Sequence, residues 1–228
     1  MSGFDGLETV SLRDKIIRFI RSNRLSTTEV ADAMGKTGSL FGVTPISEGH
    51  YKVGPVRAVT ASGGSNYFVH EAAEGLLEGD VFLIEQNSDF SDEGLIGDLV
   101  AKYALLYKGA ASIVVNGNVR DYARLLRERY PIWATGRNPV GATNEKIGIA
   151  EHNVCDGGIA VCDDGGVVII PPLAITDLLF EQLRRIEQTE DLWYFCLDSL
   201  GMSTFEIVCK RRYLQRLDEI PESLQLGT

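Results

Sequence analysis

The chain has 228 residues, of which 44% are apolar and 24% are charged, and its formal net charge is −10 at pH 7. This apolar content is enough for a packed core, so the composition excludes a disordered or collagen-like chain. The acidic balance argues against a protein that grips nucleic acid through a basic face. It leaves room for a small anionic substrate in a local basic pocket.

The N-terminus lacks the basic-then-apolar layout of a signal peptide, and no apolar run approaches the ~20 residues of a membrane span. The four cysteines form no CxxC pair and have no zinc-like spacing with the histidines. They are Cys155, Cys162, Cys196 and Cys209. We therefore expect free thiols in a cytoplasmic protein, with neither a membrane nor a nucleic acid as partner.

The first third of the chain contains two short helical patterns and one strand pattern. Leu12, Ile16, Phe19 and Ile20 recur at helical spacing, which predicts an amphipathic helix over residues 12–23. Ser26-Thr27-Thr28-Glu29 resembles a capping box at the start of a helix that runs through Met34. The sequence then predicts a strand over 54–60, a turn over 61–66 and a helix over 68–77.

From residue 81 onward, short apolar strands alternate with helices. This alternation predicts an α/β domain with a sheet covered by helices. The expected elements are strands over 81–85, 112–115 and 131–135, helices over 99–108, 121–129 and 176–190, a hairpin over 157–171 that turns at Asp164-Gly165, and a C-terminal helix over 203–220.

Arg120 and Asp121 follow a predicted strand at the point where the chain turns into a helix. Ligands of open α/β sheets collect at such strand ends. An arginine fork suits a carboxylate or enolate oxygen, and an aspartate suits Mg²⁺ or Mn²⁺, so the pair suits a metal-bound 2-oxo acid. From spacing alone, an ion pair that caps the helix is the more common interpretation.

Gly97-Asp98-Leu99 lies at a second junction between a loop and a helix, where free N–H groups face outward and can bind an anion. Asp98 as a plain N-cap is the alternative. The two junctions belong to successive units of the sheet. We expect them to face each other across one pocket.

These two motifs, Gly97-Asp98-Leu99 and Val119-Arg120-Asp121, resemble the signature of the 4-hydroxy-4-methyl-2-oxoglutarate and 4-carboxy-4-hydroxy-2-oxoadipate aldolases. The same family contains the non-catalytic regulator of ribonuclease activity A. The resemblance extends over about residues 25–200, through Thr28–Gly38, Gly54–Thr60, Gly79–Val81 and Cys162–Val167. The regulators lack the aspartate of the Arg-Asp pair, which this chain keeps.

The resemblance implies a swivelling α/β fold, a ββα-type sandwich with a covered sheet and with N- and C-terminal helices. It implies one domain over 1–228, with the N-terminal helix within 1–24 and a helical tail over 203–228. It also implies homotrimers or homohexamers with active sites between subunits. The activity would be a lyase that uses Mg²⁺ or Mn²⁺ and forms pyruvate from a small 2-oxo acid.

The resemblance also implies roles for single residues. Arg120 would bind the 2-oxo oxygen, Asp121 would hold the metal, and Asp98 would orient metal-bound water. Gly97 and the N–H groups near Leu99 would bind the substrate carboxylate.

Three further positions complete the implied site. Asp32 stands where the aldolases carry an acid that crosses a subunit interface. Asn144 stands where they carry a lysine and is assigned to substrate binding. Lys146, two positions further on, is the catalytic candidate to replace that lysine.

Two other functions stay open. One is a non-enzymatic oligomeric regulator that binds a protein partner, and the other is a different enolate-type reaction in a specialised pathway. Among the remaining polar residues, His152 is a weaker catalytic candidate, and Tyr122 is either a pocket-border residue or an ordinary first-turn aromatic. Trp133 is expected in the core.

Overall fold

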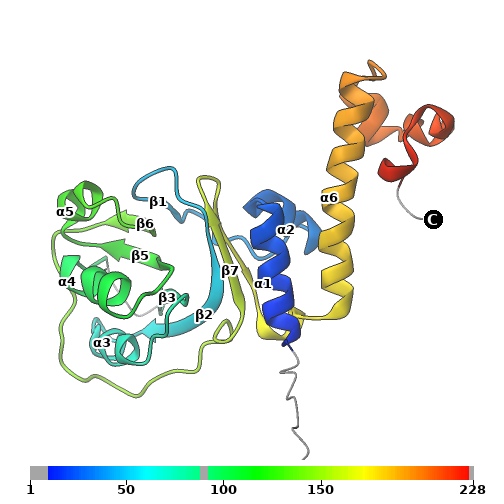
Figure 1. Ribbon diagram of the computed structural model, residues 1–228. Coiled ribbons are helices and arrows are strands. Elements are labelled where there is room, and N and C mark those ends of the chain that lie inside the picture. The colour runs from blue at the N-terminus through cyan, green and yellow to red at the C-terminus, as the bar shows by residue number, and fades with distance from the viewer. Residues whose placement is uncertain (1–9, 88–91, 226–228) are drawn as a thin grey trace, which may run out of the picture. The chain divides into compact units, whose positions relative to one another are not determined.

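The computed structural model describes residues 10–87 and 92–225 (Figure 1). These form two compact units, one that ends at Thr176 and one that begins at Asp177. The expectation of one functional domain over 1–228 stays a prediction. No helix among the described residues combines the length and the apolar character needed to cross a membrane.

The first unit is built on an eight-stranded mixed sheet with the order β1-β6-β5-β3-β2-β7-β8, in which β4 pairs with β5. Strands β2, β3, β5 and β6 are parallel to one another, whereas β1, β7 and β8 pair antiparallel. The strands are β1 Thr44–Pro45, β2 Lys52–Ala61, β3 Val81–Gln86, β4 Gly94–Ile96, β5 Ser112–Val119, β6 Ile132–Arg137, β7 Ile159–Asp163 and β8 Gly166–Ile170.

The sheet curves so strongly that its two edges approach each other, as in a nearly closed barrel (Figure 1). The backbone N–H of Leu40, just before β1, donates to Val167 O in β8 over 3.0 Å. Inside the curve, Val56, Leu83 and Val114 pack with residues of β7 and β8. The fully buried Trp133 belongs to this core and donates from Nε1 to Asp163 O over 2.7 Å, which confirms the prediction that it is a core residue.

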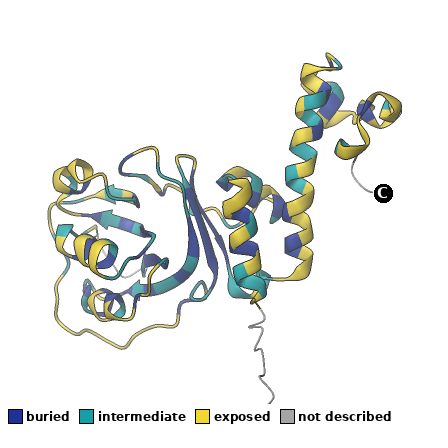
Figure 2. Ribbon diagram, in the orientation of Figure 1, coloured by how far each residue is buried: buried dark blue, intermediate teal, exposed yellow. Residues whose placement is uncertain are grey.

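A second core fills the space between the other face of the sheet and the helices α3, α4 and α5 (Figure 2). Its sheet residues alternate with those of the first core, because successive side chains of a strand point to opposite faces. The helices of this unit are α1 Leu12–Asn23, α2 Thr27–Ala33, α3 Tyr67–Glu74, α4 Asp98–Lys102, which continues as a π-helical turn Tyr103–Tyr107, and α5 Tyr122–Arg127, with a short 3-10 turn at Pro172–Ala174.

The predicted local signals at the N-terminus are confirmed. Ser26 and Glu29 form a reciprocal capping box, with Ser26 N–H donating to Glu29 Oε2 over 2.6 Å. On α1, Ile16 and Ile20 are buried as the helical spacing predicted.

The predicted hairpin turn at Asp164-Gly165 also forms, between β7 and β8.

The second unit begins with the long helix α6, Asp177–Asp198, which extends eight residues beyond the predicted end at Glu190. The predicted helix over 203–220 is wrong. That stretch is a π-helical turn Phe205–Cys209 followed by short 3-10 turns at Arg212–Gln215 and Leu217–Glu219, with a further one at Glu222–Leu224. The left-handed backbone of Arg211, φ 48°, interrupts the helix, and Ile207, Tyr213 and Ile220 are buried with Cys196 instead of lining one helical face.

Candidate active site

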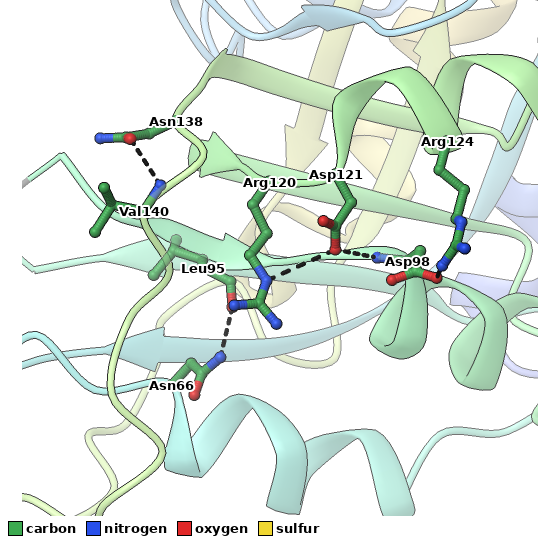
Figure 3. A network of polar contacts seen from close by, with 8 residues as sticks. All are labelled: Asn66, Leu95, Asp98, Arg120, Asp121, Arg124, Asn138 and Val140. Carbon is green, nitrogen blue, oxygen red and sulfur yellow. Dashed lines mark hydrogen bonds and ion pairs between the residues drawn. The ribbon is translucent and has the colours of Figure 1, made fainter.

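Arg120 and Asp121 lie where β5 ends and α5 begins. The backbone N–H of Arg120 donates to Ile96 O over 2.8 Å, which ties this turn to the neighbouring strand β4. Asp121 has the left-handed conformation, φ 55° and ψ 26°, which a short polar side chain tolerates better than most. The sharp turn brings the two adjacent side chains together, with Arg120 Nε 3.7 Å from Asp121 Oδ2 (Figure 3).

The second predicted junction meets the first. β4 ends at Ile96 beside β5, and α4 starts at Asp98. The backbone N–H of Asp98 donates to Asp121 Oδ2 at 3.4 Å, so one carboxylate oxygen faces both the guanidinium and the start of α4 (Figure 3). The structure therefore brings Gly97, Asp98, Arg120 and Asp121 to one place, as expected from a strand end and a separate loop-to-helix junction in the sequence.

Three glycines make room for the Arg120 side chain. A Cβ at Gly94 would lie 2.9 Å from Arg120 N, and one at Gly97 would lie 3.1 Å from both Arg120 Cγ and Nε. A Cβ at Gly141 would overlap the guanidinium at Nη1, and one at Gly97 would also overlap Asp121 Oδ2. Backbone therefore lies close to Arg120 along its length, from its N and Cβ atoms to the guanidinium, which limits the conformations that its side chain can adopt.

Arg124, one turn into α5, forms a hydrogen-bonded ion pair with the carboxylate of Asp98 (Figure 3). The hydrogen bond from Arg124 holds the pKa of Asp98 below its ordinary value, against the smaller opposing effect of desolvation. Asp98 is therefore ionised at neutral pH. The sequence alone did not single out Arg124, although its place one turn after Asp121 on a short helix is the signal that could have done so.

A surface pocket of about 610 Å³ opens beside this cluster. We call it the arginine pocket because three arginines line it. Its lining residues are Val119, Arg120, Asp121, Tyr122, Ala123, Arg124, Arg137, Asn138 and Pro139. Tyr122 therefore borders the pocket, which was one of the two interpretations of its position. The Arg137 guanidinium carbon lies 4.4 Å from the centre of the Tyr122 ring.

Asn144 and Lys146 lie near a different pocket. Asn144 lines a pocket of about 470 Å³, together with Tyr67, His70, Glu71 and Glu74. The Lys146 ammonium lies over the Tyr67 ring, 5.5 Å from its centre. These two residues therefore stand on the α3 side of Arg120, outside the lining of the arginine pocket.

The other predicted site residues are spread more widely. Asp32 lies exposed on α2, which packs on β7 and β8, and neither of these strands pairs with β5 or β6. The side chain of Leu99 is largely exposed, and His152 is exposed as well. The described residues contain no cluster of three or more His, Cys, Asp or Glu side chains that could enclose a metal ion.

The glycine-bearing turn over residues 61–66 has a structural role. Asn66 is buried, and its Nδ2 donates to Leu95 O in β4 over 2.9 Å (Figure 3). One turn along α3, burial lowers the pKa of His70, and the positive charge of Arg120 lowers it further. His70 is therefore predominantly neutral at pH 7.

This fold is an α/β sheet with a charged site at the carboxyl ends of its parallel strands, the usual position for ligands in this class. Residues 27–169 match the family model described as RraA-like, Aldolase/RraA. The chain belongs to this family, which confirms the resemblance found in the sequence.

Three relatives define the similarity. A Halalkalibacterium halodurans protein, provisionally named as a 4-hydroxy-4-methyl-2-oxoglutarate aldolase, is 32% identical over 166 residues, which are 68% of this chain and 77% of that protein. Protein DlpA of Legionella pneumophila is 27% identical over 180 residues, 72% of this chain but only 29% of DlpA. The crystal structure of Streptomyces coelicolor RraAS2, described as an unusual member of the RNase ES inhibitor RraA family, matches with a TM-score of 0.63 and 24% identity, over 79% of this chain and 96% of that one.

Proposed function

We propose that the protein is a divalent-metal-dependent carbon–carbon lyase that acts on a carboxylated 2-oxo acid, by retro-aldol cleavage or by decarboxylation through a pyruvate-type enolate. The observation that carries the proposal is the Arg120–Asp121 pair beside ionised Asp98 at the rim of the arginine pocket. The aldolase name of the 32% identical relative supports the same reaction class.

Arg120 is the proposed electrostatic catalyst. In retro-aldol cleavage the C4 hydroxyl gives its proton to a water molecule, the C3–C4 bond breaks, and its electron pair passes to C3 and the 2-oxo group. C4 becomes the carbonyl carbon of one product, and the enolate takes up a proton at C3 to give pyruvate. Loss of CO₂ from oxaloacetate leaves the same enolate. Arg120 donates to the oxygen on which the negative charge develops, and donors fixed before the reaction usually contribute the largest catalytic effect. The close approach of Gly97 and Gly141 to its side chain restricts that position on one part of its surface.

Asp121 is the proposed protein ligand of Mg²⁺ or Mn²⁺. Mg²⁺ is usually held by one or two carboxylates together with water and substrate oxygens, and the Asp121 side chain, 42% exposed at the pocket rim, fits such an open site. When bound, the cation would act as a Lewis acid on the 2-oxo group. Asp98, ionised beside Arg124, would orient water at this site.

The substrate's own carboxylate would be bound at the start of α4, by Gly97 and the backbone N–H groups near Leu99. Asn144 and Lys146 would contribute from the α3 side, where Lys146 lies over Tyr67. Asp32 lies on α2, which packs on β7 and β8, whereas Arg120 follows β5, so we propose that Asp32 reaches the site from a second copy. We therefore propose a homotrimer or homohexamer with sites between subunits. The free thiols of all four cysteines fit a cytoplasmic protein.

The proposal is tested by turnover of oxaloacetate and a panel of 4-hydroxy-2-oxo acids, measured as pyruvate release with and without a chelator. We expect release that the chelator abolishes and that added Mg²⁺ or Mn²⁺ restores. Activity that persists in the chelator would refute the role of the metal. The description of RraAS2 as a member of an RNase inhibitor family keeps a regulator function as the alternative, and it would be favoured if no substrate were turned over while a specific protein partner bound.

A further inference from the structure

Arg137 lines the arginine pocket but has no role in the proposed reaction. Arg120 and Arg124 are engaged by Asp121 and Asp98, respectively. Within the part of the chain that the structure describes, Arg137 has no carboxylate at ion-pair distance, and its guanidinium contacts the ring of Tyr122. A guanidinium without a carboxylate partner, in a pocket of a chain with net charge −10, is the feature to explain.

Arg137 is held beside Arg120 by the sheet. It is the last residue of β6 and pairs in register with Val119 of β5, the residue just before Arg120. Neighbouring strands lie about 4.8 Å apart, so the backbones of the two arginines are close at the same sheet end. The register between β5 and β6 therefore determines the distance between the two arginine backbones.

Tyr122 contacts the Arg137 guanidinium but does not neutralise its charge. The guanidinium carbon lies 4.4 Å from the ring centre, within the range of a cation–π interaction. The N–H groups lie in the plane of the guanidinium, at its edge, where they can bind both oxygens of one carboxylate. An arginine that keeps its charge beside Arg120 in the same pocket can therefore bind a carboxylate.

We propose that Arg137 is a specificity-determining residue that binds a second carboxylate of the substrate, remote from the 2-oxo group. The inference rests on the proposed function, because it takes Arg120 to bind the 2-oxo end. The carboxylated 2-oxo acid of the proposed function would then lie with its 2-oxo end at Arg120 and its distal carboxylate at Arg137. A phosphate group would offer the same anionic oxygens, and the experiment must separate the two.

The test uses two unreactive probes that differ in the distal carboxylate alone, 2-oxoglutarate and 2-oxopentanoate. Their dissociation constants are measured by titration calorimetry on the full chain in Mn²⁺ buffer. We expect the wild type to bind 2-oxoglutarate about 10- to 100-fold more tightly, the usual effect of a hydrogen bond to a charged group. Arg137→Gln should remove that difference and leave the affinity for 2-oxopentanoate unchanged, while Arg137→Lys should keep part of it.

Arg127→Gln is the matched control, since Arg127 lies on α5 outside the pocket and pairs with Glu128 at 3.7 Å. This variant should keep the wild-type preference. A wild type without preference, or an Arg137→Gln variant that retains it, would overturn the inference. Tighter competition by inorganic phosphate than by 2-oxoglutarate would also overturn it, in favour of a phosphate site. Failure of the proposed lyase is recognised separately, as a lack of turnover while the probe preference persists.

Discussion

Gly97 and Asp121 are in contact in a way that leaves no space for a side chain at position 97. A Cβ there would overlap the Oδ2 atom of Asp121, the same oxygen that faces Arg120 Nε and the N–H of Asp98 (Figure 3). The glycine at the start of α4 therefore fixes where the carboxylate after β5 can lie. This contact links two segments that are 24 positions apart in the chain.

Gly97→Ala should strongly lower the proposed lyase activity with little loss of stability. The added methyl group must displace the exposed Asp121 carboxylate, and a shift of about 1 Å at a reacting centre can cost about 100-fold in rate. The measurement is kcat for pyruvate release together with the thermal midpoint. Gly75→Ala is the matched control, because Gly75 has φ −86° and a Cβ there would lie 3.5 Å from Ala72 O, an ordinary contact distance, so activity should be unchanged and stability equal or slightly higher.

Arg120→Gln should lower kcat by about 10²–10³, the usual effect of losing one donor to a developing negative charge. The side chain is half exposed, so the fold should be retained. Steady-state kinetics of the variant beside Arg127→Gln, which leaves the pocket intact, checks this. A kcat within a factor of about three of the wild type would show that Arg120 is not the electrostatic catalyst.

Asp121→Asn should weaken binding of the divalent cation and lower turnover by more than about 100-fold. Replacement of a residue that merely supports a metal ligand already costs about 10–100-fold, and a ligand should cost more. Asparagine tolerates the left-handed conformation at φ 55°, so the backbone turn should survive. Mn²⁺ binding followed by electron paramagnetic resonance gives a reading that does not depend on activity. Unaltered Mn²⁺ affinity would show that Asp121 is not a ligand of the metal.

Stability should decline as the pH falls below about 6.5, in part because of His50. Burial lowers the pKa of His50 from 6.5, with a further contribution from Lys52, so the unfolded chain takes up a proton more readily than the folded one. A group of this kind contributes stability above its unfolded pKa and loses it as the pH drops from that value toward the lowered folded pKa. The measurement is the thermal midpoint at about pH 7.5 and about pH 5.5, on either side of the ordinary pKa of histidine. Between these two pH values, the midpoint of His50→Gln should change less than that of the wild type.

The sequence predicted those parts of the fold and site that local patterns determine. The cores of β3, β5 and β6 are continuous apolar runs, and Arg120, Asp121 and Asp98 each stand at a visible change from strand or loop to helix. The family resemblance added their proposed roles. Each of these signals extends over only a few neighbouring residues of the chain.

The parts that the sequence did not predict depend on pairing between distant segments. β4 has only three residues, too few for a periodic pattern. It forms because β5 continues past its last pair with β3, and β4 pairs with that end of β5. In the sequence, Arg137 is an ordinary charged residue after a predicted strand. Its place in the arginine pocket depends on the pairing of Arg137 with Val119, which no local pattern indicates. The C-terminal segment has helical composition, but the left-handed turn at Arg211 and the separate burial of Tyr213 and Ile220 break it into short turns.

The most direct measurement is a crystal structure of the protein with Mn²⁺ and oxalate, a planar mimic of the pyruvate enolate, with the metal located by its anomalous signal. We expect manganese at the Asp121 carboxylate and oxalate between it and the Arg120 guanidinium. A metal peak elsewhere, or oxalate that leaves Arg120 without a contact, would contradict the assignment of this pair to catalysis.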